Sequence, residues 1–360
     1  MKKVAILIPT KDRLEFLIRT INYYVSIKSQ HPIFIGDASS QSHEEEVLNA
    51  AKDKIEVYYF HWKDLNDRRT IIKLAEEADN LVELTYCAFH GDDDFLISES
   101  LSICADFLDS NKNYSTAQGR AFSFQLKEEG PYGELKGLGV YWGINYLDGD
   151  TALDRLKCIS SNYWVPIFSV CRITDFIHNI SVGVDSVIDR DLGEYTNVFS
   201  IAMSGKSKFI DCLYLARQVH NQVHLSSSRF EWITSEDWHI SYTELVNSLS
   251  EVLSNSDNIK LTESRSEIAQ SIKSVIGLGN QLPIRKLLIS KYSEYIDKKM
   301  FIYLISVFYR KIKYSSIFYS NDFSRRGLMS PKSIYYKDVS SIIDICKKNI
   351  SASNLDCPSQ

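Results

Sequence analysis

The stretch FHGDDDFL, residues 89–96, holds three consecutive aspartates between two apolar runs. Burying a carboxylate without a partner costs several kcal/mol, so Asp92, Asp93 and Asp94 need a counter-charge if the fold buries them. Mg²⁺ and Mn²⁺ prefer oxygen ligands and commonly bind one or two carboxylates together with substrate phosphates. Asp92 and Asp94 are therefore candidate metal ligands that would hold a nucleoside diphosphate. The alternative is a solvated acidic turn that caps a helix beginning near Ser98.

The segments that must position this triplet alternate between strand and helix patterns. Strands are expected in 3–9, 32–37, 55–60 and 81–89, and helices in 14–25, 42–52 and 67–79. Such alternation predicts an α/β domain with right-handed crossovers, whose ligands bind beyond the carboxyl ends of the strands. Three polar clusters, 10–13, 37–40 and 92–94, each follow an expected strand. We expect them to converge at one edge of the sheet.

Composition limits the class of protein. The chain of 360 residues is 44% hydrophobic and 24% charged, which is typical of a globular protein. Its net charge of −5 argues against a general nucleic-acid binder, which needs a basic face. The seven cysteines never form a CxxC pair, so neither a disulfide framework nor a zinc site is indicated, and a reducing compartment fits. The sequence shows no signal-peptide pattern and no apolar run of roughly 20 residues. A cytoplasmic location is therefore expected, either in solution or at the inner face of the membrane.

Three motifs resemble those of family 2 glycosyltransferases. VAILIPTKDR is similar to the first strand and loop of that family, IFIGDASS to its nucleotide-binding strand, and FHGDDDF to its Asp-x-Asp strand end, in the family's order and spacing. The resemblance covers roughly residues 2–225. It implies an α/β GT-A fold and the transfer of a sugar from a nucleotide donor.

The resemblance also implies a donor site with Mn²⁺ or Mg²⁺ as cofactor and a UDP-sugar as the first expectation for the donor, ahead of GDP- and dTDP-sugars. Its expected donor-binding residues are Pro9, Thr10, Arg13, Asp37, Arg69, Lys73, Asp92, Asp93 and Arg217. The backbone at Pro9 and Thr10 would face the nucleoside, and Asp37 would bind the base or ribose unless it only closes an Asx-turn. Gly36 stands where relatives usually have another acid, which leaves the base open.

Basic residues on the helix before the acidic strand have two interpretations. The family often has a basic or amide residue there that faces the donor, which would assign Arg69 and Lys73 to the donor site. The alternative is a solvated helix surface on which these residues and Arg68 pair with Glu76 and Glu77. At least one arginine is expected to follow the second interpretation.

The segment LGEYTNVFSIAMSGK, residues 192–206, resembles the helix that carries the catalytic base in inverting members of the family. Glu194 matches the base and Gly205 the glycine that follows it. An acid at a helix N-terminus is kept ionised by the helix dipole and can accept a proton from an acceptor hydroxyl. Asp191 is the alternative base, and a helix-start acid without catalytic duty is the competing interpretation.

The segment LYLARQVHNQVH adds a candidate arginine and histidine after another apolar run. Family relatives often carry a histidine here that reaches the metal or the diphosphate, so His220 joins Asp92 and Asp94 as an expected metal ligand. Arg217 could neutralise the charge that develops on the leaving group. Four aromatic residues, Tyr141, Trp142, Tyr163 and Trp164, could stack on acceptor sugars, although packing is the commoner role of large aromatic residues.

The character of the chain changes near Ser226, where helical periodicity takes over, so a GT-A domain of residues 1–225 and a mainly helical domain of residues 226–360 are expected. The basic and aromatic tract 298–319 is too short to cross a membrane. It could lie in an anionic leaflet as an interfacial helix, or be a buried helix of the C-terminal domain.

The sequence thus predicts a metal-dependent inverting glycosyltransferase that acts on a glycan or lipid-linked acceptor. A noncatalytic sugar-nucleotide or glycan-binding protein on the same fold is the rival, since fold does not fix function. A nucleotidyltransferase is a further alternative, but such enzymes normally open with a glycine-rich phosphate loop, which IPTKDRLEF lacks.

Overall fold

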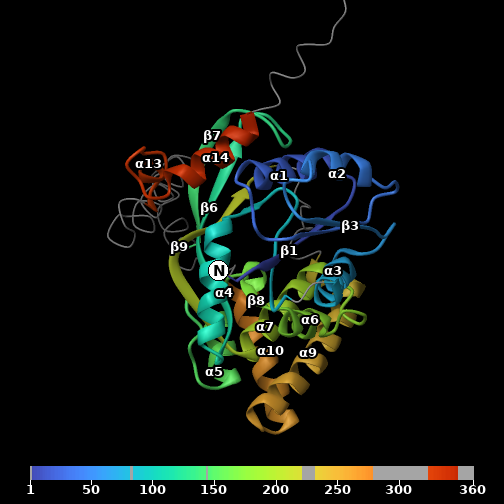
Figure 1. The fold of residues 1–360 in the computed structure, drawn as a ribbon. Coiled ribbons are helices and arrows are strands. Elements are labelled where there is room, and N and C mark those ends of the chain that lie inside the picture. The colour runs from blue at the N-terminus through green and yellow to red at the C-terminus, as the bar shows by residue number, and fades with distance from the viewer. Residues whose placement is uncertain (1, 82–83, 143–144, 221–231, 279–322, 348–360) are drawn as a thin grey trace, which may run out of the picture.

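The computed structural model describes residues 2–81, 84–142, 145–220, 232–278 and 323–347 (Figure 1). The strands are β1 (Val4–Thr10), β2 (Ile33–Asp37), β3 (Val57–His61), β4 (Tyr86–Phe89), β5 (Phe95–Leu96), β6 (Tyr114–Leu126), β7 (Leu135–Trp142), β8 (Val170–Arg172) and β9 (Lys206–Gln218). The helices are α1 (Leu14–Ser26), α2 (Glu44–Ala51), α3 (Asp67–Leu81), α4 (Ser98–Ser110), α5 (Ala152–Ser161), α6 (Ile173–Ser181), α7 (Arg190–Ser204), α9 (Glu236–Asp257), α10 (Leu261–Leu278), α13 (Arg325–Leu328) and α14 (Tyr336–Lys347). A short 3₁₀ helix spans Pro166–Phe168.

The strands form one nine-stranded sheet in the order β3-β2-β1-β4-β8-β6-β9-β5, with β7 paired to β6. Strands β3, β2, β1 and β4 are parallel, as the alternation of strands and helices predicts. The prediction of an α/β fold is therefore confirmed. Strand β4 is shorter than expected, because α3 continues to Leu81.

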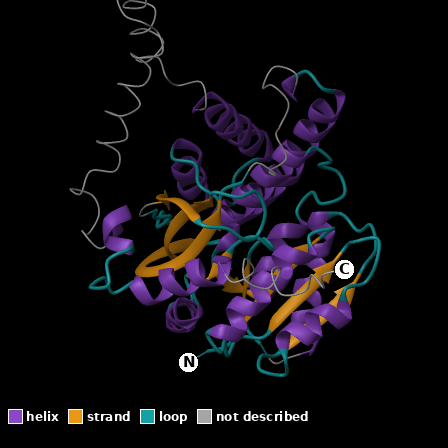
Figure 2. Cartoon of the chain, turned by 90° about the horizontal axis from the view of Figure 1, so that it is seen from above, coloured by secondary structure: helices purple, strands orange, loops and turns teal. Residues whose placement is uncertain are grey.

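Helices cover both faces of the parallel strands (Figure 2). Alternate side chains of β1 pack in the cores on opposite faces. Val4, Ile6 and Ile8 pack in the core that α1, α2 and α4 share. Ala5 and Leu7 pack in a second core beneath α3 and α6. Burial on both faces explains why this strand is a continuous apolar run in the sequence.

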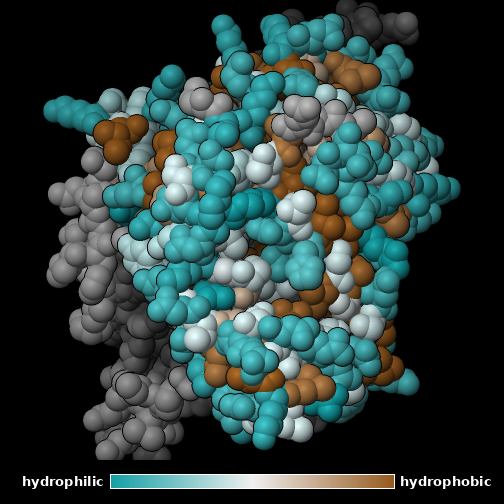
Figure 3. Space-filling view, turned by 60° about the horizontal axis from the view of Figure 1, so that its bottom comes forward, coloured by the Kyte–Doolittle hydropathy of each residue, from teal (hydrophilic) through white to brown (hydrophobic). Residues whose placement is uncertain are grey.

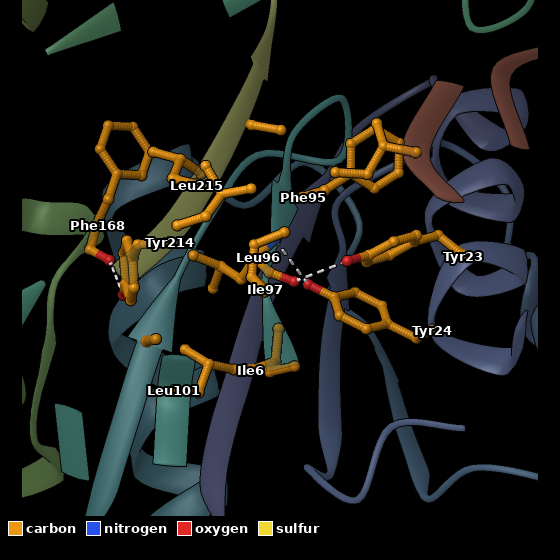
Figure 4. Close-up of a cluster of buried hydrophobic side chains, with 14 of the residues drawn as sticks. Ile6, Tyr23, Tyr24, Phe95, Leu96, Ile97, Leu101, Phe168, Tyr214 and Leu215 are labelled. Carbon is orange, nitrogen blue, oxygen red and sulfur yellow. Dashed lines mark hydrogen bonds between the residues drawn. The ribbon is translucent and has the colours of Figure 1, made fainter. Parts of the chain in front are cut away.

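Two tyrosines of α1 fix the short strand β5 that follows the acidic triplet. The Tyr23 hydroxyl donates to the carbonyl of Leu96 at 3.4 Å, and the backbone N–H of Leu96 donates to the Tyr24 hydroxyl at 3.3 Å (Figure 4). The Tyr24 hydroxyl also lies 2.8 Å from Nε2 of His90, just before the triplet. Buried contacts therefore hold both ends of the acidic turn.

The described parts of the C-terminal region are helical and pack on different parts of the sheet domain. Helices α9 and α10 share a core with α5 and α7, whereas α14 packs against α1. The predicted boundary at residue 226 and the tract 298–319 lie outside the described residues, so the division into two domains stays a prediction. Within the described ranges, no helix is long and apolar enough to cross a membrane.

Candidate functional site

The acidic triplet lies in the turn between β4 and β5, at the carboxyl end of β4. The register Thr10↔Asp37 between β1 and β2 and the 2.7 Å hydrogen bond from the N–H of Asp12 to Oγ of Ser39 bring the first two polar clusters together. The Thr10 hydroxyl donates to Oδ2 of Asp92 at 2.7 Å and so joins the first cluster to the third. The three clusters meet at one edge of the sheet, as predicted.

Asp92 is buried beside the loop that follows β1. Its side chain is 3% exposed, and the Arg13 guanidinium makes an ion pair with its Oδ1 at 2.9 Å. No hydrogen-bond donor among the described residues is aligned with that oxygen. Burial raises the pKa of Asp92 to about 7, although Arg13 favours the ionised form.

Asp94 is held by β9 on the other side of the turn. Its Oδ2 accepts a hydrogen bond from Nε of Arg217 at 2.9 Å, and its Oδ1 accepts one from the N–H of Gln218 at 3.2 Å. The side chain is 1% exposed. Burial raises the pKa of Asp94 to about 7, against the attraction of Arg217. Both oxygens of Asp94 are thus bonded within the protein.

Asp93 is the most accessible carboxylate of the triplet, with 16% of its side chain exposed. Its Oδ2 lies 3.0 Å from Nη2 of Arg13 and 2.8 Å from Nε2 of His220, and these two nitrogens are 3.3 Å apart. Burial favours the protonated form, but His220 and Arg13 outweigh it and lower the pKa of Asp93. The Arg13 guanidinium therefore occupies a position that Asp92, Asp93 and His220 all face.

Arg19 fixes the backbone of the triplet, a role that sequence reasoning missed. This buried side chain donates to the carbonyl of Asp93 at 2.8 Å, to Oε1 of Gln218 at 2.5 Å and to the carbonyl of Pro131 at 2.7 Å. Thr20 adds a 2.7 Å bond to the carbonyl of Asp92. A charged residue between the apolar positions of a predicted helix is the only sequence signal for Arg19, and it does not identify the partners.

Arg217 is placed where the sequence suggested, at the edge of the acidic site. Besides Asp94, its guanidinium contacts the Tyr141 hydroxyl at 2.5 Å and lies over the rings of Tyr141 and Phe168, 4.9 Å from each centroid. The side chain stays 30% exposed. Tyr141 therefore packs on Arg217 at the rim of the site.

The fully buried carboxylate of Asp37 forms hydrogen bonds that stabilise the turn after β2. It accepts hydrogen bonds from the N–H of Ser39 at 2.8 Å and from the Tyr59 hydroxyl at 2.6 Å. This geometry matches the Asx-turn alternative. The missing acid at Gly36 also has a steric reason, because a Cβ there would lie 2.7 Å from Cγ2 of Thr70 and 3.0 Å from Cγ of Leu74 on α3.

The cations of α3 have partners outside the triplet. Arg68 is bonded to the carbonyls of Val182 and Val187, both at 3.1 Å, a role that neither interpretation predicted. Arg69 pairs with Asp185, and the Lys73 ammonium lies 4.5 Å from the ring centroid of Trp62. The expected pairs with the helix glutamates do not appear among the contacts described for these three residues.

Glu194 and Asp191 both lie on α7, but Glu194 lies farther from the start of the helix than expected. The helix begins at Arg190, so Asp191 is in its first turn and Glu194 in the second. The exposed Glu194 accepts a 2.7 Å hydrogen bond from the Tyr163 hydroxyl. Arg68 of α3 lies against Gly193, which places the start of α7 beside the start of α3, at the same sheet edge as the triplet.

The donor atoms around the acidic turn limit which residues could bind a metal ion. Among the described residues, no group of three or more histidine, cysteine, aspartate or glutamate side chains is arranged to hold a metal ion by itself. Asp94 is unsuited because both its oxygens are bonded. Oδ2 of Asp93 and Nε2 of His220 are bonded to each other, so a cation here would have to displace existing contacts and take part of its ligands from substrate phosphate oxygens.

Solved structures with a similar fold include the glycosyltransferase TarS of S. aureus. Residues 1–349 of TarS in complex with UDP-GlcNAc align with a TM-score of 0.50 and 13% identity, over 79% of this chain and 77% of that chain. A longer TarS structure aligns with a TM-score of 0.48 and 13% identity, over 76% of this chain but only 43% of its own length. No family model matches the sequence, and no curated protein matches it. The likeness shows that this chain has the GT-A fold.

Proposed function

We propose that the protein is a glycosyltransferase that uses a nucleotide-sugar donor, with a UDP-sugar as the first candidate. The observation that carries the proposal is the arrangement of Arg13, His220 and Arg217 around an acidic turn at the carboxyl edge of the sheet. The TarS structure with the same fold was solved with UDP-GlcNAc, which supports a UDP-sugar here.

Arg13 and Arg217 are the proposed diphosphate-binding cations. Their side chains are 31% and 30% exposed, so each guanidinium can contact a ligand. Arg217 can do so while it stays anchored to Asp94, whereas Arg13 would leave Asp92 when a metal ion binds. In the reaction, Arg217 would stabilise the negative charge of the departing nucleoside diphosphate. The backbone at Pro9 and Thr10 remains the proposed nucleoside wall. Asp37 would act by holding the neighbouring turn, because its own oxygens are bonded to Ser39 and Tyr59.

Asp93 and His220, with Oδ1 of Asp92 beside them, are the proposed metal ligands, in preference to the set Asp92, Asp94 and His220 predicted from the sequence. Mg²⁺ or Mn²⁺ bound there would offset the charge of the diphosphate. The geometry supports this choice, since all three side chains face the Arg13 guanidinium. Arg13 would have to withdraw from them for a metal ion to bind. Arg69 and Lys73 would contribute only through the wider electrostatic field of the donor site.

Glu194 is the proposed base, with Asp191 as the alternative, and inversion by direct displacement is the proposed stereochemical course. Glu194 is exposed and its Oε1 accepts one hydrogen bond, so a lone pair remains for the hydroxyl of a glycan or lipid-linked acceptor. Burial raises the pKa of Asp191, which makes it a stronger base than a free aspartate.

A thermal-shift panel of UDP-, GDP- and dTDP-sugars with and without Mn²⁺ tests the proposal, because a ligand of the folded state raises the unfolding midpoint. We expect a UDP-sugar to raise the unfolding midpoint, and we expect part of this rise to depend on Mn²⁺. Asp93→Asn should remove that part, whereas Glu134→Gln, a change at an exposed acid paired with Lys127, should leave it intact. No shift with any nucleotide sugar would refute the proposal.

A further inference from the structure

Five aromatic side chains form a continuous row that starts at the proposed base. The aromatic row consists of Tyr163, Tyr195, Trp232, Trp238 and Tyr242. Successive ring centroids are 5.4, 6.4, 6.3 and 4.9 Å apart; the first three pairs meet edge to face, and the last two rings are stacked with nearly parallel planes at 12°. The hydroxyl of Tyr163, the first member, donates to Glu194.

The aromatic row lies at the edge of a core. All five of its side chains pack against the core that α5, α7, α9 and α10 share and keep part of their surface exposed, whereas Tyr24, Phe95 and Tyr214 have no exposed surface. The row runs from Tyr163, which follows α5, through Tyr195 of α7 to the first two turns of α9. Figure 3 looks from the side of these helices and shows a mostly hydrophilic surface with patches of hydrophobic residues; tyrosine and tryptophan are not coloured as hydrophobic on its scale. Aromatic rings placed in this way offer apolar surface to a ligand that also carries polar groups.

The row is held in place by hydrogen bonds at the start of α7. Nε1 of Trp232 donates to Oδ2 of Asp189 at 2.8 Å, and the other oxygen of Asp189 caps α7 by accepting from the N–H of Leu192. The N–H of Asp189 donates to Ser241 of α9 at 2.8 Å. Fixed rings lose little conformational freedom when a ligand binds, which favours recognition.

The charge around the row limits the class of ligand. Asp189, Asp191 and Glu194 lie on its α7 side, and Glu236 and Asp237 occupy the first turn of α9. These acids would repel a phosphate- or carboxylate-bearing polymer. They accept hydrogen bonds from hydroxyl groups. A neutral sugar chain, with apolar ring faces and hydroxyl edges, matches both features.

We propose that the aromatic row binds a neutral oligosaccharide acceptor and leads its reacting hydroxyl to Glu194. This inference rests on the proposed glycosyltransferase function and extends it to the acceptor. The stacked pair Trp238 and Tyr242 supplies binding energy at the far end. Tyr163 orients Glu194 at the near end, as a positioning residue.

The test measures glycan binding without a donor. Neutral hexasaccharides of glucose, N-acetylglucosamine and mannose, with polygalacturonate as the anionic comparison, are titrated by calorimetry against wild type and the double variant Trp238→Ala/Tyr242→Ala. Loss of two stacking rings should weaken binding of the preferred neutral sugar by about tenfold or more. UDP binding should stay within about twofold, since stacking rings do not contact the donor cations in this proposal.

Two further variants control for folding and for unspecific loss of an aromatic surface. Trp238→Phe keeps a ring and should retain most of the affinity, while Tyr146→Ala removes an exposed aromatic residue outside the row and should bind like wild type. For any acceptor found, the double variant should raise the acceptor KM and leave the donor KM unchanged.

The outcomes separate this inference from the proposed function. Unchanged glycan affinity in the double variant, tighter binding of polygalacturonate than of any neutral sugar, or no neutral binding by wild type at millimolar concentrations would each overturn the acceptor site. If neutral sugars bind at the row but no sugar nucleotide binds, the row is confirmed as a glycan site and the transferase proposal fails instead.

Discussion

The pair formed by Asp94 and Arg217 offers a quantitative test of how the acidic turn is stabilised. Asp94 is almost fully buried, and Arg217 is the charged partner that contacts its carboxylate. Removing one partner of a buried ion pair leaves an uncompensated charge and costs about 3 to 5 kcal/mol. Because Asp94 has a pKa of about 7 and is fully ionised only above that pH, and because Arg217 is itself partly exposed, we expect Arg217→Gln to cost about 3 kcal/mol near pH 9 and much less at pH 7.

The companion variant leaves a charge that water can reach. Asp94→Asn keeps the shape of the side chain and leaves a partly exposed guanidinium, so a loss of about 1 to 2 kcal/mol is expected. Combining the two changes should recover part of the loss, with a coupling free energy of about 2 kcal/mol. Urea unfolding followed by circular dichroism, on wild type, both single variants and the double variant, measures that coupling.

A surface pair in the same chain provides the matched control. Lys127 and Glu134 are 2.7 Å apart, but their side chains are 58% and 60% exposed. The same cycle with Lys127→Gln and Glu134→Gln should give a much smaller coupling, because water and salt screen an exposed pair. A coupling for Asp94 and Arg217 no larger than that of the surface pair would refute the argument that burial makes this ion pair structural.

Four other changes test the remaining arguments. Glu194→Gln should keep donor affinity and lower single-turnover transfer by about 10² to 10⁴-fold; if transfer is unchanged and Asp191→Asn abolishes it, the base is Asp191. Arg13→Gln should tighten Mn²⁺ binding without nucleotide by about tenfold, because a like charge is removed from the proposed ligands, and calorimetry showing equal or weaker binding would contradict this. Burial lowers the pKa of His31 below its ordinary 6.5, so the unfolded chain binds more protons below pH 6.5 and stability falls there; urea midpoints of His31→Gln should fall less than those of wild type between pH 7 and 5, and parallel curves would exclude His31. Gly36→Asp should destabilise the fold by about 1 to 3 kcal/mol through its clash with α3, and an unchanged urea midpoint would show that the helix moves freely.

The fold and the meeting of the polar clusters could be predicted because both follow from local patterns. Parallel strands carry their carboxyl ends to one edge, so Thr10, Asp37 and Asp92 had to lie near one another once three strands were recognised. The prediction that the buried aspartates of the triplet need a counter-charge was also correct. The first counter-charges are arginines and a histidine of the protein itself, which the sequence pattern did not rank above a metal ion.

The details that escaped prediction depend on long-range contacts. Nothing local tells that Arg19 reaches Gln218, or that Tyr59 uses an oxygen of Asp37. The position of Glu194 differs from the expectation for a smaller reason: Asp189 caps α7, so the helix begins earlier than the resemblance suggested. Helix starts are set by which side chain accepts from the first free N–H groups, and several nearby acids compete for that role.

The contacts between the N-terminal loop, the acidic turn and β9 have a consequence for biosynthesis. Asp94 meets its partner Arg217 across 123 residues of sequence, so a growing chain exposes an acidic turn without its partner until β9 has been made. Contacts of such separation form late, after the entropy of closing a long loop has been overcome. Because β9 ends at Gln218, the ribosome must make more than half of the 360-residue chain before the site can exist. We expect truncated chains that end before β9 to leave the turn open, to be cleared by proteases, and to bind no nucleotide.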